Sequence, residues 1–178
     1  MRARFGIGLM ALLLLAGCGQ QRVEDLLVAC PALVLPADAA DMTRYRPGAA
    51  EDLSALVLDA RIQGLSGGCA RGSRDRSVDV TLTARFSAER GPASSETAVD
   101  LPWFLAVVEQ DTGRIISRQA FTQRVVFRDN MTRAVAASRE VNIRFPVGEG
   151  RRVQDHAVVA GFVLTAEELA LNRRRGPR

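Results

Sequence analysis

The chain has 178 residues, of which 47% are hydrophobic and 25% are charged, and its net charge at pH 7 is +4. This composition excludes an intrinsically disordered protein, because such chains have few apolar residues and a high net charge. All 24 basic residues are arginines. The isoelectric point is therefore high without a large excess of positive charge, and it does not indicate a nucleic-acid partner.

The first 17 residues have the pattern of a secretory signal peptide. Arg2 and Arg4 supply a basic start, residues 7–15 form an apolar run, and two small residues precede Cys18. The run is too short for a membrane-spanning helix, which needs about 20 apolar residues. We therefore expect residues 1–17 to be removed, and the remaining 161 of the 178 residues suffice for one domain.

The end of this leader, Leu15-Ala16-Gly17-Cys18, resembles the lipobox of bacterial lipoproteins and matches it at every position. The resemblance implies that the Cys18 thiol carries a diacylglycerol group and that cleavage occurs just before it, followed by acylation of the new N-terminus. Several acyl chains anchor a domain stably, whereas one chain binds marginally. The alternative is a secreted protein with a chance cysteine. Because Gly19 rather than Asp follows, the resemblance implies the outer membrane, facing the periplasm, rather than the inner membrane.

Seven short segments after the leader have the alternating or continuous apolar pattern of β-strands. They are residues 33–35, 56–63, 78–86, 101–109, 114–127, 141–145 and 156–164. Residues 78–86 alternate most regularly, so one face of this strand is predicted to be buried. Residues 101–109 are apolar on both faces, which is typical of a central strand. Trp103 and Phe104 in this run are assigned to the core rather than to a ligand cage.

Glycines and the C-terminal residues are expected to limit these elements. Gly64, Gly67 and Gly68 should end the second strand and place Cys69 in the connection to the third. Residues 166–178 are expected to form a short helix and a basic tail.

The helix start has a specific signal, since Thr165 can cap it and Glu168 lies three residues further on. The arginines from Arg173 onward are expected to be frayed and solvated. Contact of this tail with anionic lipid head groups is the alternative.

Short strands separated by glycine, proline and aspartate turns predict an all-β protein. We expect an antiparallel β-sandwich of about seven strands over residues 31–165, tethered through residues 18–30. Its outline resembles immunoglobulin-like or fibronectin-like sandwiches. The immunoglobulin order of cysteine, tryptophan and cysteine is absent, because Trp103 follows both Cys30 and Cys69.

Cys30 and Cys69 are the two cysteines left after Cys18. An even pair in an oxidising compartment indicates a disulfide. Two free thiols, or a metal site that includes His156, are the alternatives. The sequence has no C-x-x-C or H-x-x-x-H spacing, so we expect neither a metal nor a cofactor.

The sequence contains no catalytic motif that stands out. His156, the only histidine, follows Asp155, but no G-x-S-x-G turn supplies a nucleophile, and a structural histidine at a strand start is favoured. Asp75 and Asp79 lack the glycine and glutamate of a calcium loop. Asn130 begins an N-x-T glycosylation motif, which occurs often by chance.

These observations predict a non-enzymatic envelope lipoprotein, held on a membrane by its lipid and presenting a sheet edge or loops to another envelope protein. The chain is similar to small envelope lipoproteins of Gram-negative bacteria, a resemblance that implies no activity. The alternative is a periplasmic carrier of a small ligand or lipid in the gap between the sheets. A hydrolase based on His156 is less favoured, and no nucleic-acid partner is expected.

Overall fold

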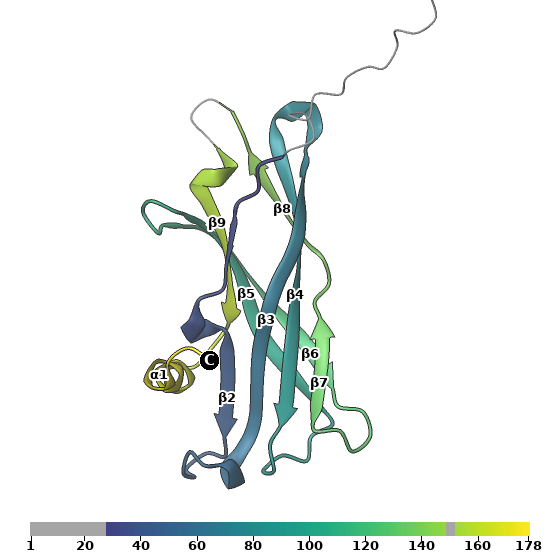
Figure 1. The fold of residues 1–178 in the computed structure, drawn as a ribbon, viewed down its shortest axis with the longest axis vertical. Helices are drawn as coiled ribbons and strands as arrows, with labels where there is room; N and C mark the ends of the chain where they lie inside the picture. Colours follow the sequence, from purple (N-terminus) through teal and green to yellow (C-terminus); the bar gives the residue numbers. More distant parts are fainter. Residues whose placement is uncertain (1–27, 149–151) are drawn as a thin grey trace, which may run out of the picture.

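The computed structural model describes residues 28–148 and 152–178, except for the side chain of Asp75. The predicted leader, the lipobox with Cys18 and most of the predicted tether lie outside the described residues. The described chain forms two packed sheets and one helix (Figure 1).

Sheet A has four strands in the order β1 (Ala32–Val34), β9 (His156–Phe162), β5 (Ala98–Glu109) and β6 (Ile115–Val126). Sheet B contains β2 (Asp41–Tyr45), β3 (Leu56–Arg71) and β4 (Ser77–Arg90), followed by β7 (Arg133–Ala137) and β8 (Val141–Pro146). Both β7 and β8 pair with β4, at different points along its length. Short 3-10 turns occur at Ala37–Ala39 (η2), Leu53–Ala55 (η3), Ser73–Asp75 (η4) and Val153–Asp155 (η5).

The predicted all-β sandwich with a C-terminal helix is confirmed. The described residues form nine strands rather than about seven, and the β1–β9 pair is parallel while the other pairs are antiparallel. The closer likeness to immunoglobulin or fibronectin domains stays a prediction.

The core lies between the sheets and follows the period-two pattern of the sequence. The five inward residues predicted on β4 are all buried: Val78, Val80, Leu82, Ala84 and Phe86. Aromatic rings fill the centre, with ring centroids 5.4 Å apart for Phe86 and Trp103 and 4.8 Å apart for Trp103 and Phe121. Burial of one such ring contributes roughly 1.5–3 kcal/mol. Strand β5 is central in sheet A, as predicted from its apolar faces.

Phe104 is not part of this core, contrary to the prediction. It alternates with the inward residues Trp103 and Leu105, so it lies on the outer face of sheet A. The guanidinium of Arg118 stacks over its ring, 4.6 Å from the centroid. A run that is apolar on both faces does not reveal which of two neighbours points inward, and only the pairing of β5 resolves this.

The predicted end of the second strand is wrong. Strand β3 continues through Gly64, Gly67 and Gly68 to Arg71, and Cys69 lies within it, opposite Val80 of β4. The register shifts between Ile62 and Gly64, so the first glycine marks a β-bulge rather than an end.

Two strands that the sequence analysis did not predict, β2 and β7, complete sheet B. Strand β2 contains the buried Asp41 and Thr43, which interrupt its apolar pattern. Strand β7 has only small residues, Ala134 and Ala136, on its half-buried face. Neither segment has an apolar face strong enough to be recognised without its partner strand.

Helix α1 (Ala166–Arg175) begins as predicted, with a capping box between Thr165 and Glu168. The predicted frayed tail is wrong, because Arg175 and Arg178 are bound to sheet B. Arg178 forms hydrogen bonds of 2.8 and 2.9 Å to the Asp59 carboxylate and lies 2.9 Å from Asp41 Oδ1.

The predicted disulfide between Cys30 and Cys69 is confirmed, with the two Cα atoms 5.8 Å apart. It joins the segment that leads into β1 to the end of β3. The disulfide thereby links the chain just before β1 of sheet A to β3 of sheet B, at the end of the sandwich where the β3–β4 connection lies (Figure 1).

Candidate functional site

A groove lies at the same end of the sandwich. Within the described chain, strands β6 and β8 are each paired on one side only, β6 with β5 and β8 with β4. Strand β6 contacts β7 across the two sheets, but the sandwich stays open between the first half of β6 and β8. The resulting groove has a volume of about 580 Å³.

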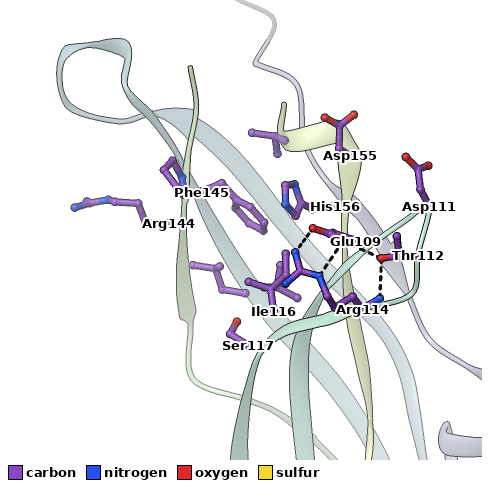
Figure 2. A pocket seen from close by; sticks show the side chains of 14 residues that line it. Glu109, Asp111, Thr112, Arg114, Ile116, Ser117, Arg144, Phe145, Asp155 and His156 are labelled. Atoms are coloured by element: carbon purple, nitrogen blue, oxygen red, sulfur yellow. Dashed lines mark hydrogen bonds and ion pairs between the residues drawn. The ribbon is translucent and has the colours of Figure 1, made fainter. Parts of the chain in front are cut away.

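Its floor is apolar and its rim is polar (Figure 2). The apolar residues that line it are Val107, Ile116, Ile143, Phe145, Pro146 and Val153. The polar lining residues are Glu109, Asp111, Thr112, Arg114, Ser117, Arg144, Asp155 and His156. Ile116 is 46% exposed, so a large apolar side chain at this strand edge remains accessible to a partner.

The β5–β6 turn forms one wall and is rigidly bonded. Gly113 has a φ of +68°, which allows the tight turn predicted at this position. The Glu109 carboxylate accepts hydrogen bonds from the Thr112 hydroxyl at 2.8 Å and from Arg114 Nε at 3.1 Å (Figure 2). These bonds, above all the one from Arg114, hold the pKa of Glu109 below its ordinary value and raise the pKa of Arg114.

His156 begins β9, is half-buried and lies beside Glu109, its partner on β5. Its Nδ1 lies 3.1 Å from the Arg152 carbonyl oxygen, so this nitrogen carries the proton and donates it. The ring also lies against that of Phe145, with centroids 5.8 Å apart (Figure 2). The histidine is therefore held by the backbone and by packing, as the structural interpretation predicts.

The residues around His156 do not form a catalytic triad within the described part of the chain. Asp155 does not orient the ring, because its carboxylate accepts from the Arg152 backbone N–H at 3.3 Å and pairs with the Arg152 guanidinium. No serine or threonine hydroxyl is hydrogen-bonded to the ring among these residues. The ring is oriented by the Arg152 carbonyl group and by Phe145 rather than by a carboxylate.

The other residues named from the sequence lie away from the groove or bind residues that line it. The Asp79 carboxylate accepts two hydrogen bonds from Arg144, at 2.6 and 3.1 Å, and these lower its pKa. Among the described residues, no group of three or more histidine, cysteine, aspartate or glutamate side chains could hold a metal ion. Asn130 is exposed in the loop between β6 and β7.

Sequence reasoning found His156 and Asp155 but not the groove that contains them. Ile115-Ile116 at the start of β6 was a usable signal, because two large apolar residues directly after a tight turn rarely both face a core. The contribution of β8, through Ile143 and Phe145, depends on the packing of one sheet on the other and has no local signature.

Comparisons with protein-family models, with curated proteins and with solved structures found no match. Within residues 28–148 and 152–178, no helix has the length and apolar character needed to cross a membrane.

Proposed function

We propose that this chain is a non-enzymatic bacterial envelope lipoprotein, anchored through Cys18, that binds an extended segment of another envelope protein in the groove between β6 and β8. The complete lipobox Leu15-Ala16-Gly17-Cys18 supports the anchor. The proposed site is the outer membrane, with the β-sandwich facing the periplasm. The Cys30–Cys69 disulfide is consistent with an oxidising compartment.

One observation carries the binding proposal: two unpaired strand edges flank an apolar groove. An edge strand offers free backbone N–H and C=O groups, and an added strand pairs with them. The first six residues of β6 are all exposed, and no strand among residues 28–148 and 152–178 pairs with their outer edge. An extended segment laid along β6 would place alternate side chains on Ile143 and Phe145 in the groove floor.

Photo-cross-linking in intact envelopes tests this proposal. A photoreactive residue in place of Ser117, which faces the groove, should give protein adducts whose cross-linked peptides come from one partner segment. The same residue in place of Thr83, on the outer face of sheet B, is the matched control and should not. Equal adducts at both positions, or none at Ser117, would contradict the proposal.

A second candidate function is the carriage of a small apolar ligand. A groove of about 580 Å³ is within the range of small-molecule sites. The gap between the sheets, where such a cavity was expected, is occupied by Phe86, Trp103, Phe121 and Phe162. Adducts at Ser117 with the mass of a lipid or metabolite would favour the carrier over the protein-binding function.

A further inference from the structure

The outer face of sheet A is mostly apolar over two neighbouring rows of residues. The pairing of strands aligns two rows of outward residues across all four strands. The first row is Ala32, Ala157, Val108 and Ile115. The second row is Val34, Val159, Ala106 and Arg118. Seven of these eight side chains are apolar. Ile115 is 61% and Val34 40% exposed at the two edges, Val108 and Val159 are half-buried, and Ala106 and Ala157 are buried between them.

The outer face of sheet B is polar, in contrast to the two apolar rows of sheet A. Its outward residues on β4 are Asp79, Thr81, Thr83, Arg85, Ser87 and Glu89. A sheet with one face on the core normally has polar residues on the other face. Sheet B follows this rule, whereas the two rows of sheet A do not. Exposed apolar surface of this kind marks a contact site.

We propose that this face of sheet A docks on the bilayer that holds the lipid anchor, a step that rests on the proposed lipidation of Cys18. Val28, the first described residue, lies ten positions after Cys18, and ten positions span at most about 35 Å. The chain then enters the fold at β1, which is the edge strand of this face. A body tethered there has its apolar rows within reach of the lipid surface.

The charges on the face fit a lipid surface better than a second copy of the chain. Its upper rows carry one cation, Arg118, and no carboxylate. The outward carboxylate of β5, Asp100, lies toward the other end of the sheet and pairs with Arg124. Two copies packed through this face would bring their Arg118 side chains together without a carboxylate between them. Anionic phospholipid head groups supply the missing negative charge.

Arg118 is also arranged as a residue at a lipid interface. Its guanidinium stacks over Phe104, and the Phe104 ring lies close to Gly161 of β9. The aliphatic stem of an arginine can cover apolar surface while its charged end reaches the head groups. Phe104 and Arg118, which ends the second row, thus mark the border between the apolar rows and the head-group layer.

The test uses the lipidated mature protein in vesicles of phosphatidylcholine and phosphatidylglycerol. A fluorophore is attached to Ile115→Cys on the proposed face or to Val135→Cys, the control on the outer face of sheet B, which is 72% exposed. Lipids brominated in their acyl chains should quench the label at position 115 at least about twofold more than the label at position 135. Both positions are exposed, so neither change should prevent folding.

Each other outcome overturns the docking for a distinguishable reason. Equal quenching with the protein bound to vesicles shows that the anchor works but holds the body away from the bilayer. Cross-links between two copies through position 115, without quenching by lipid, assign the face to self-association. Failure of the protein to bind vesicles, with an unmodified Cys18 in its mass, refutes the proposed anchoring together with the docking.

Discussion

Gly67 lets β3 and β4 approach each other closely. A Cβ atom on Gly67 would lie 2.2 Å from the Thr81 carbonyl oxygen and 2.7 Å from Leu82 Cδ2, whereas one on Gly68 would meet nothing within 4 Å. Neither glycine has a positive φ, so the difference is one of space alone. The sequence shows two identical neighbours, and only the packing distinguishes them.

Gly67→Ala should therefore destabilise the protein by roughly 1–3 kcal/mol, because overpacking forces backbone or side-chain shifts. Gly68→Ala is the matched control and should change stability by no more than about 0.5 kcal/mol. Urea unfolding of the two variants measures both values. Equal effects would show that steric contact at Gly67 is not what limits the strand pair.

Glu109 gives the groove wall a pH dependence whose sign follows from its hydrogen bonds. The folded state lowers its pKa below the ordinary 4.5, mainly through Arg114 and then Thr112. The stabilisation from the Glu109 carboxylate is therefore complete above pH 4.5 and is lost as the pH falls through the lowered pKa. Titration of the carboxylate carbon by NMR should show this low midpoint. Arg114→Ala should move it up toward the ordinary value, and an unmoved midpoint would refute the assigned cause.

At the scale of elements, a buried amide and an exposed ion pair both join helix α1 to the rest of the fold. Asn172 is buried and its Nδ2 donates hydrogen bonds to the Asp38 and Asp41 carbonyl oxygens at 2.9 and 2.8 Å. Arg174 pairs with Glu51 at 2.9 Å, but both side chains are mostly solvated.

Asn172→Ala should cost about 1–3 kcal/mol, since it leaves two carbonyl groups without their donor in a site closed to water. Arg174→Ala, on the same helix, should cost less than about 1 kcal/mol because exposed ion pairs contribute little. Thermal unfolding compares the two variants directly. A larger loss in Arg174→Ala would mean that charge, not the amide, docks the helix.

The elements predicted from the sequence are those with strong local patterns. The alternating residues of β4, the apolar run of β5 and the capping box at Thr165 all identified their elements correctly. The end of β3 was misplaced because the pairing of its glycines with β4 outweighs their intrinsic preference for turns. The binding of Arg178 to Asp59 joins positions 119 apart, and no local sequence pattern predicts it.

At the scale of the molecule, three features gather at one end of the sandwich. Cys30 lies there, the disulfide ties it to β3, and the groove opens between β6 and β8. The candidate site was therefore only partly predictable. His156 was visible as a rare residue, but the groove exists because two sheets diverge, and that depends on packing over the whole chain.

The disulfide should contribute strongly to the stability of this end. Its cysteines are 39 positions apart, and closing a loop of this length contributes roughly 3–4 kcal/mol in the chain-entropy account. Replacement of both Cys30 and Cys69 by serine should lower the unfolding free energy by about that amount. Reducing agent should destabilise the native protein and leave the double variant unchanged, and an equal effect on both would rule out the disulfide as the cause.

Anchoring by lipid at Cys18 is the central claim, and the mass of the mature protein from native membranes tests it most directly. The account predicts an N-terminus at Cys18 that carries the mass of a diacylglycerol group and an added acyl chain. The variant Cys18→Ser should lack both and should leave the membrane fraction. A mature chain that starts at another residue, or an unmodified Cys18, would contradict the account.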